Sequence, residues 1–305
     1  MPDPTAFVPS TLAPPTSAPG LGASGAGDAE FAMTRADFDQ VRRLIHRHAG
    51  IHLADGKEAM VYGRLARRLR ETGHATFAAY LQYFERTVAA GGAGAEAEVQ
   101  QFINCLTTNL TSFFREEHHF PALSEDLRAR AAVGGSQPLR IWCSAASTGE
   151  EPYSIAITVL ESLGASARVE ILASDIDTQV LSVAERGVYP ADSRGLSGER
   201  LRAYFQRGTG PNSGRIRVRP ELARLTRFAT FNLVNGDWSR LGGPFDIVFC
   251  RNVMIYFDAA TQRRVLQRMH GVLKPGGLLY VGHSENFSDA RELFRLRGKT
   301  VYERV

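Results

Sequence analysis

The stretch SAASTGEEPYS, residues 144–154, decides the fold of this chain. It stands between an apolar segment typical of a strand, residues 139–143, and a segment typical of a helix, with Pro152 where proline suits the first helical turn. A turn of this kind attracts an anion, because backbone N–H groups and the positive end of the helix dipole meet there. Here Glu150 and Glu151 already bring two negative charges. The turn therefore favours a ligand with a cationic centre over a phosphate.

S-adenosylmethionine, with its positive sulfonium and amino groups, is such a ligand. Thr148 and Glu151 also have the spacing of a capping box, in which a hydroxyl and a carboxylate satisfy N–H groups at a helix start. Both roles are compatible if one glutamate caps the helix and the other faces the ligand. The spacing favours Glu151 as the cap and leaves Glu150 for the ligand, and the assignment stays open.

The next predicted strand, residues 169–173, leads into Asp175 and Asp177. In nucleotide-binding α/β folds, an acid at the tip of the second strand accepts hydrogen bonds from ribose hydroxyls. Asp177 directly precedes a helical pattern, so an N-cap role explains it without a ligand. We therefore expect Asp175 to be the ribose-binding acid.

Composition predicts two folded units behind a disordered arm. Residues 1–32 hold six of the 14 prolines, are rich in Ala, Ser and Gly, and contain no Lys or Arg. The chain of 305 residues has neither a secretory signal pattern nor an apolar run long enough for a bilayer. We expect a cytoplasmic protein without direct membrane insertion. Its net charge of +4 permits acidic partners without requiring nucleic acid.

Helical periodicity predicts an all-helical domain over residues 33–119, followed by an α/β domain over residues 120–305. Strands are expected at residues 227–233, 245–250 and 278–281, and residues 301–302 suit an edge strand. This alternation predicts a doubly wound, mostly parallel sheet whose ligands bind beyond the carboxyl ends of its strands. A glycine-rich turn at residues 208–214 predicts a small antiparallel β insertion over residues 187–230.

Two groups of side chains have alternative explanations. Arg64, Arg67 and Arg68 share one helix face, which is either a solvated surface or a docking face for an acidic partner. His118 and His119 lie beside two glutamates, but neighbours on a helix point in different directions, so no metal site is expected. The three cysteines lack paired spacing and are expected to be reduced core thiols.

Five motifs together resemble the CheR family of chemotaxis receptor methyltransferases. They are TTNLTSFFRE at residues 107–116, AASTGEEPYS at 145–154, ASDID at 173–177, FCRNVMIYF at 249–257 and GHSEN at 282–286. The resemblance implies methyl transfer from S-adenosylmethionine to receptor glutamates. It covers nearly the whole chain after the arm.

The resemblance also implies roles for individual residues. On the methyltransferase pattern, the cofactor would be bound by Asn109, Thr111, Arg115, one of Glu150 and Glu151, Asp175, Asn232, Leu233, Arg251 and Asn252. Arg115 and Tyr256 would lie near the transferring methyl group as catalytic residues. Arg64, Arg67 and Arg68 would dock the acidic methylation helices of the receptors, and the β insertion resembles that of members that bind a receptor tail peptide.

The expected chemistry is simple, because a glutamate carboxylate with a reference pKa of about 4.3 is already ionised at neutral pH. No general base is needed, and in-line alignment with exclusion of water remains the main task. Two alternative functions make different predictions. A nucleic-acid methyltransferase would show salt-sensitive binding to RNA or DNA, and a non-enzymatic S-adenosylmethionine sensor would bind the cofactor without turnover.

Overall fold

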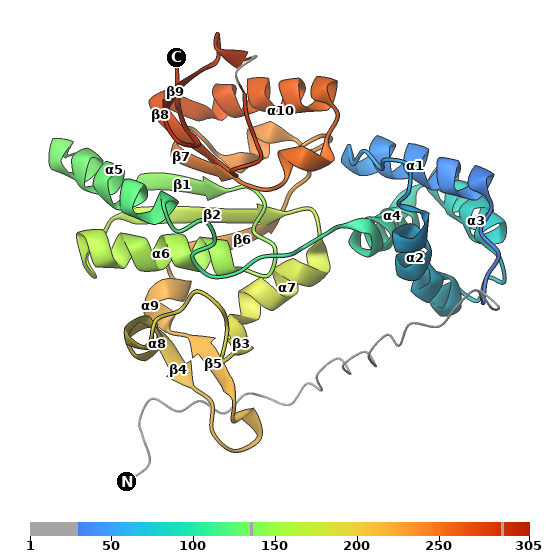
Figure 1. The fold of residues 1–305 in the computed structure, drawn as a ribbon, viewed down its shortest axis with the longest axis horizontal. Coiled ribbons are helices and arrows are strands. Elements are labelled where there is room, and N and C mark those ends of the chain that lie inside the picture. Colours follow the sequence, from blue (N-terminus) through green and yellow to red (C-terminus); the bar gives the residue numbers. More distant parts are fainter. Residues whose placement is uncertain (1–29, 135–136, 288–289) are drawn as a thin grey trace.

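A computed structural model describes residues 30–134, 137–287 and 290–305, and Figure 1 shows a helical domain beside an α/β domain. The predicted arm therefore lies almost wholly outside the described residues. Its last residues are described, and Phe31 is buried against the helical domain with its backbone N–H donating to the Tyr62 hydroxyl at 3.2 Å. The folded part thus begins before residue 33.

The helical domain consists of α1 (Arg35–Ala49), α2 (Glu58–Thr72), α3 (Phe77–Ala90) and α4 (Gly92–Leu106). Thr34 and Asp37 form a capping box at the start of α1, and Gly50 ends that helix in the left-handed conformation. Apolar faces of all four helices, including fully buried Phe38 and Phe84, enclose one core. This core supplies a rigid support for the α1–α2 loop, which faces the α/β domain.

The main sheet has seven strands in the order β6-β2-β1-β7-β8-β10-β9. The parallel strands are β1 (Leu139–Cys143), β2 (Val169–Asp175), β6 (Thr226–Thr230), β7 (Phe245–Cys250) and β8 (Leu273–Val281). β9 (Phe294–Gly298) and β10 (Val301–Arg304) complete it in antiparallel fashion. The predicted doubly wound, mostly parallel sheet is confirmed, and the strand order reverses beside β1, where such folds bind ligands.

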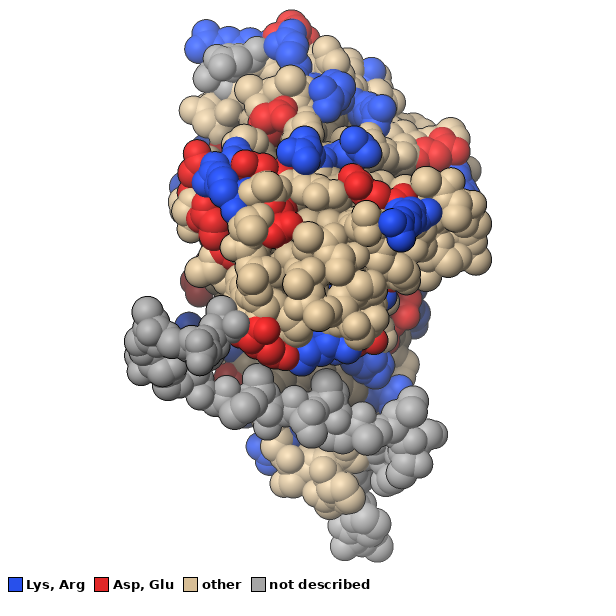
Figure 2. Space-filling model, turned by 90° about the vertical axis from the view of Figure 1, so that its right-hand side faces the viewer, with Lys and Arg blue, Asp and Glu red and all other residues tan. Residues whose placement is uncertain are grey.

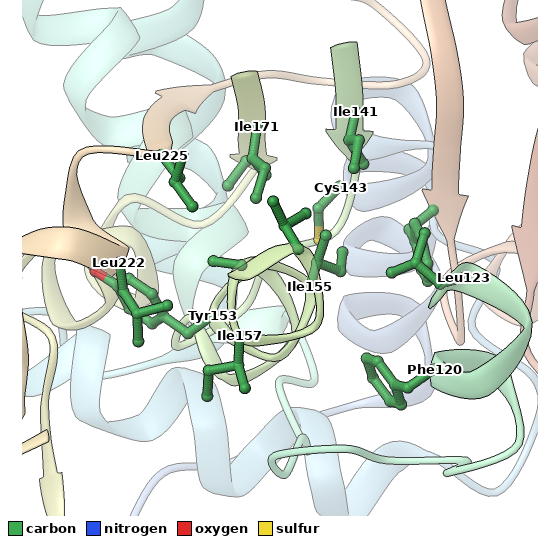
Figure 3. Close-up of a cluster of buried hydrophobic side chains, with 14 of the residues drawn as sticks. Phe120, Leu123, Ile141, Cys143, Tyr153, Ile155, Ile157, Ile171, Leu222 and Leu225 are labelled. Carbon is green, nitrogen blue, oxygen red and sulfur yellow. The ribbon is translucent and has the colours of Figure 1, made fainter. Parts of the chain in front are cut away.

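Successive side chains of the central strands point to opposite faces of the sheet, as a strand requires. Ile141 and Cys143 of β1 pack in one apolar cluster with α5 (His119–Val133) and α6 (Glu150–Leu163), whereas Trp142 belongs to a second cluster with α10 (Ala259–Val272). Figure 3 shows α6 at the centre of the first cluster, with Ile155 directed towards the strands. Burial on both faces explains why these strands are continuously apolar.

A three-stranded antiparallel sheet extends from one end of the molecule, as Figure 1 shows. It consists of β3 (Val188–Pro190), β4 (Phe205–Arg207) and β5 (Arg215–Val218), in the order β3-β5-β4, with α8 (Gly198–Tyr204) beside it. Residues 226–230, which the sequence pattern placed in this insertion, pair instead with β2 as part of the main sheet. The short helix α9 (Pro220–Ala223) leads between the two sheets.

One strand prediction is wrong in its position. Residues 301–302 belong to β10, but β10 lies between β8 and β9 and is not the edge of the sheet. The edge on this side of the sheet is β9, whose residues after Phe294 are exposed and include Arg295 and Arg297. Charged residues on an edge strand oppose pairing with other chains.

Candidate active site

A cavity of about 590 Å³ lies where the helical domain meets the carboxyl ends of β1, β2 and β7. Its volume is in the range of small-molecule sites. The expected ligand-binding residues that line it are Asn109, Thr111, Arg115, Glu151, Asp175, Asn232, Leu233, Arg251, Asn252 and Tyr256, together with Arg64. Glu150, Arg67 and Arg68 are not among its lining residues. The structure thus brings segments far apart in the sequence to one place.

The turn after β1 depends on a glycine. Gly149 has a φ of +100° and precedes α6, and a Cβ atom there would lie 2.6 Å from the Tyr189 hydroxyl and 2.8 Å from Ala184 Cβ. Both the backbone conformation and the close packing exclude a larger residue. Tyr189 in turn donates to the carbonyl of Thr148 at 2.8 Å. The start of α6 is therefore held close to α7 (Thr178–Arg186) and the small sheet.

Glu151 is the glutamate that enters the cavity, and the preference for it as the helix cap is wrong. Gly149 is the N-cap of α6 and supplies no side-chain cap. The Glu151 carboxylate accepts a hydrogen bond at 2.7 Å from Arg251, whose side chain is 1% exposed, and another at 3.2 Å from the Cys143 thiol. A buried guanidinium 100 residues away, which helix spacing cannot reveal, decides its orientation.

Glu150 is not among the residues that line the cavity and accepts a hydrogen bond from the Thr148 hydroxyl at 2.6 Å. Burial raises the pKa of Glu150, while the Thr148 hydroxyl partly opposes that shift. The two glutamates therefore differ in environment: only Glu151 lines the cavity, and neither side chain caps the helix.

Asp175 lies at the carboxyl end of β2 and lines the cavity, only 8% exposed. Its carboxylate accepts the backbone N–H groups of Ser147 at 2.8 Å and Asp177 at 3.0 Å. Burial raises the pKa of Asp175 to about 6, although these backbone donors oppose the shift. Asp177 caps α7 by accepting from the N–H groups of Gln179 and Val180, which confirms its predicted N-cap role.

The linker between α4 and α5 joins the helical domain to this strand end. Asn109 donates to Asp177 at 2.8 Å, and its carbonyl accepts from the Ser147 hydroxyl at 2.9 Å. Thr107 donates to the same Asp177 at 2.6 Å. Asp177 therefore organises the linker as well as α7, a function that its capping pattern does not reveal.

Asn232 and Leu233 follow β6 and contribute a third wall of the cavity. The Asn232 amide donates to the carbonyl of His48 at 2.7 Å, while its oxygen accepts from the N–H of Val234 at 2.9 Å. This links the C-terminal end of α1 to the α/β domain. Asn232 therefore acts at the domain contact as well as along the cavity.

Arg115 lies on the cavity wall with one guanidinium nitrogen donating to the carbonyl of Leu110 at 2.8 Å. The carbonyl of Arg115 itself accepts a hydrogen bond from Arg251. Tyr256 is half-buried on the same wall, in the short helix η3 (Met254–Tyr256) that follows β7. Both expected catalytic side chains thus border the same space.

A buried carboxylate holds the loop after β7. Glu285, 4% exposed, accepts the backbone N–H groups of Gly282, Asn252, Val253 and Met254 at 2.6 to 2.9 Å. Burial raises the pKa of Glu285, and these four donors oppose the shift. Asn252 adopts a φ of 56°, and this network stabilises that uncommon conformation. The sequence showed the GHSEN motif at residues 282–286, but it did not predict that Glu285 holds the loop after β7.

Glu116 links Arg251 to the same loop. It lies 3.6 Å from the Arg251 guanidinium and accepts from the Asn252 amide at 3.2 Å and from His283. Burial alone would raise its pKa, but His283, Arg251 and Asn252 together lower the pKa of Glu116 to about 2. Arg251 is therefore held between two carboxylates, Glu116 and Glu151.

The structure also qualifies the argument against a metal at His118 and His119. One ligand atom each from Glu116, His118 and His119 lies within 4.8 Å of the others, so the neighbouring rings do not diverge as expected. The Glu116 carboxylate is already engaged by Arg251 and His283, and His119 Nε2 lies 2.6 Å from the Thr300 hydroxyl. The nearby Arg251 charge opposes a cation there.

The basic face of α2 is less uniform than its sequence suggests. Arg68 binds Glu98, whose side chain is 4% exposed, and Arg67 pairs with Glu71 at 2.8 Å. Arg64 turns towards the linker and donates to the carbonyl of Leu106 at 2.8 Å. Figure 2, which faces the helical domain, shows charges of both signs around a broad area without charged residues. Arg68 is therefore held by a buried carboxylate, and the docking role expected for the three arginines stays a prediction.

The cavity also has lining residues that the sequence pattern did not single out. The helical domain contributes His52, Lys57 and Met60 from the α1–α2 loop and the start of α2. Phe231 and Ile176 add apolar surface near the strand ends. No spacing rule relates these residues to the sheet, because their placement depends on how the two domains pack.

The polar and apolar groups along the cavity fit S-adenosylmethionine. Buried carboxylates at Glu151 and Asp175 suit an ammonium or sulfonium group and ribose hydroxyls, respectively. The Nε atom of Arg251 is buried without a hydrogen-bond partner among the described residues, which suits a carboxylate acceptor. Phe231, Leu233 and Ile176 can cover an apolar ring.

Comparisons with known proteins show the family of this chain. The description "CheR methyltransferase, SAM binding domain" matches residues 109–303, and "CheR methyltransferase, all-alpha domain" matches residues 36–107. The chain belongs to the CheR methyltransferase family. It is 50% identical over 278 residues to chemotaxis protein methyltransferase 2 of Pseudomonas aeruginosa, covering 90% of this chain and 95% of that protein. It is also 50% identical over 273 residues to the chemotaxis protein methyltransferase of Escherichia coli, covering 89% of this chain and 91% of that protein.

This CheR protein is therefore a methyltransferase of chemotaxis that uses S-adenosylmethionine as its methyl donor. The boundary between the two family matches falls at residues 107–109, in the linker that contacts Asp177. Among the described residues, no helix is long and apolar enough to cross a membrane.

Proposed function

We propose that this CheR protein methylates glutamate side chains of methyl-accepting chemotaxis receptors, forming methyl esters. The observation that carries the proposal is the division of charge along the cavity. Glu151, at the start of α6 and paired with Arg251, and Asp175, at the end of β2, lie on the α/β side, whereas Lys57, Arg64 and Arg115 come from the helical domain and the linker. A cationic donor suits the acidic end, and an anionic acceptor suits the basic end.

With a carboxylate as the methyl acceptor, the reaction needs no general base. A glutamate has a reference pKa of about 4.3 and is ionised at neutral pH, so no group has to remove a proton. When bound, S-adenosylmethionine supplies a methyl group activated by its positive sulfur. The task of the protein is to align the acceptor oxygen and exclude water.

Arg115 is the side chain we assign to the acceptor. A guanidinium can bind a carboxylate through two parallel hydrogen bonds, and the Leu110 carbonyl already fixes the direction of one Arg115 nitrogen. Tyr256 borders the same space and would support the acceptor or the donor methyl. Replacing Arg115 by alanine should lower turnover more than the free energy of unfolding, and an unchanged rate would contradict its assignment.

Receptor docking involves two further surfaces in this proposal. Arg64 at the cavity and Arg67 on the exposed face of α2 attract acidic methylation helices, and the three-stranded sheet binds a receptor tail peptide. Calorimetric titration with a tail peptide tests the second surface directly. A titration without heat at high peptide concentration would reject it.

The proposal is tested by incubating the full chain with labelled S-adenosylmethionine and receptor cytoplasmic fragments. The expected product is a labelled fragment that releases its label in mild base, as a carboxyl methyl ester does. Label that resists base would indicate nitrogen methylation, and the absence of label on every receptor fragment would also contradict the proposal.

A further inference from the structure

Two large apolar side chains are unusually exposed at the active-site cavity. Leu110 is 80% exposed and Ile255 is 49% exposed, although both line the cavity. They come from different segments, the α4–α5 linker and the loop after β7. Scattered exposed apolar residues are normal, but two at the mouth of one functional cavity indicate a contact surface.

Both side chains stand on backbone that the structure holds in place. The carbonyl of Leu110 accepts a hydrogen bond from Arg115, and the segment just before Ile255 is fixed because Glu285 accepts the N–H of Met254 at 2.8 Å. A partner that contacts this surface would therefore meet preformed apolar groups, with little loss of backbone entropy.

We infer that Leu110 and Ile255 form an apolar rim that binds the protein segment flanking the reactive carboxylate of the methyl acceptor. The inference rests on the proposed function and adds the nature of the recognised segment. The Arg115 side chain, which we assign to the carboxylate, donates to the Leu110 carbonyl at 2.8 Å, and Tyr256 directly follows Ile255. Each residue of the rim thus adjoins a residue assigned to the acceptor.

Charge and polarity together define the occupant. Lys57, Arg64 and Arg115 line the same cavity and favour an anionic partner. The exposed apolar rim adds a preference for aliphatic or aromatic groups beside that anion. The fitting partner is therefore an acidic, amphipathic polypeptide segment, and a free carboxylic acid would leave the rim uncovered.

The test compares full-length Leu110→Ser and Ile255→Ser with the matched control Leu296→Ser. Leu296 is 55% exposed on the edge strand β9 and is not among the residues lining the cavity. Loss of one apolar contact at a binding surface should raise the KM for a receptor fragment about tenfold. The Kd for S-adenosylmethionine, measured by calorimetry, should change less than about twofold. The control should leave both constants unchanged.

A double-mutant cycle links the rim to the acceptor itself. Apolar residues within one helical turn of the methylated glutamate are replaced by serine in the receptor fragment, which is then assayed with the wild type and the rim variants. If the two surfaces touch, the effects on KM will be less than additive. Fully additive effects, or an unchanged KM for both rim variants, would overturn the inference.

Two other outcomes distinguish a failure of this inference from a failure of the proposed function. If the wild type forms no methyl ester on any receptor fragment, the proposed function fails, and the inference fails with it. If the wild type forms esters but the rim variants lose affinity for S-adenosylmethionine instead of the receptor fragment, only the inference is overturned. The two side chains would then belong to the cofactor site.

Discussion

Single residues at the strand ends determine the character of the cavity. Glu151 and Glu150 are neighbours in sequence, yet one binds Arg251 and the other accepts from Thr148. The sequence pattern indicated a division of roles because two carboxylates at one turn exceed what a cap needs. Its preference for Glu151 as the helix cap was wrong, because the distant Arg251 is invisible to local spacing.

This difference predicts opposite outcomes for two matched variants. Glu151→Gln removes one partner of a buried ion pair and should lower the free energy of unfolding by about 3 kcal/mol and weaken cofactor binding. Glu150→Gln should change the unfolding free energy by less than about 1 kcal/mol, because burial already disfavours the charged form of Glu150. Chemical denaturation and calorimetry measure both quantities. Equal effects of the two variants would contradict the assignment.

The raised pKa of Asp175 leads us to expect that cofactor binding depends on pH. Its pKa of about 6 in the folded protein means that the carboxylate, the form that accepts ribose hydrogen bonds, is lost as the pH falls through 6. Affinity should therefore fall by up to about tenfold per pH unit below that point. Asp175→Asn should bind weakly with little pH dependence, and Asp175→Ala more weakly still. Wild-type affinity that stays constant between pH 7 and pH 5 by calorimetry would remove Asp175 from the binding site.

The same raised pKa has a defined sign for stability. The folded pKa of Asp175 lies above its ordinary value of 3.8, so the ionised side chain disfavours the folded state without cofactor. This group therefore makes the cofactor-free protein less stable as the pH rises from about 4 to about 6. The ionised Asp175 that is expected to bind the cofactor therefore destabilises the protein when no cofactor is bound.

At the scale of elements, the loop after β7 is positioned by the buried carboxylate of Glu285. Four backbone N–H groups would lose their acceptor in Glu285→Ala, and buried donors left without partners are costly. We expect a loss of about 3 kcal/mol in unfolding free energy and a decrease in turnover greater than about tenfold. Glu292→Ala, in an exposed pair with Arg263, is the control. Turnover equal to that of the control would show that the loop does not depend on Glu285.

The elements themselves were largely predictable, because strands with continuous apolar runs and helices with clear caps follow local rules. β1, β2 and the N-cap at Asp177 are examples. The position of β10 was not predictable, since its apolar pattern resembles both an inner and an edge strand. Pairing order is a property of the sheet rather than of the strand.

At the scale of the whole molecule, the two domains meet at the cavity and share its walls. Hydrogen bonds from Asn232 to the His48 carbonyl and from Asn109 to Asp177 connect them. The family motifs identified most of the residues on the α/β side. Lys57, His52 and Met60 could not be predicted, because only the packing of the domains brings the α1–α2 loop and the start of α2 to the strand ends.

Substitutions of two arginines of α2 should have different effects, one on stability and the other on receptor docking. Arg68→Glu should destabilise the helical domain by about 3 kcal/mol or more, because it leaves the buried Glu98 carboxylate beside a like charge. Arg67→Glu, at a side chain 74% exposed, should leave the unfolding free energy within about 0.5 kcal/mol and raise the KM for receptor fragments in low salt. Denaturation and methylation assays measure the two effects. Unchanged KM for Arg67→Glu would reject α2 as the docking face.

The central claim is that one cavity aligns a cationic methyl donor with a carboxylate of a receptor. Tandem mass spectrometry of a receptor fragment after incubation with the full chain and S-adenosylmethionine tests it most directly, with Arg115→Ala and Leu296→Ser assayed in parallel. We predict a methyl group on glutamate side chains, lost or much reduced with Arg115→Ala and unaffected by Leu296→Ser. Methylation found only on lysine, histidine or a chain terminus, or none on any glutamate, would contradict the account.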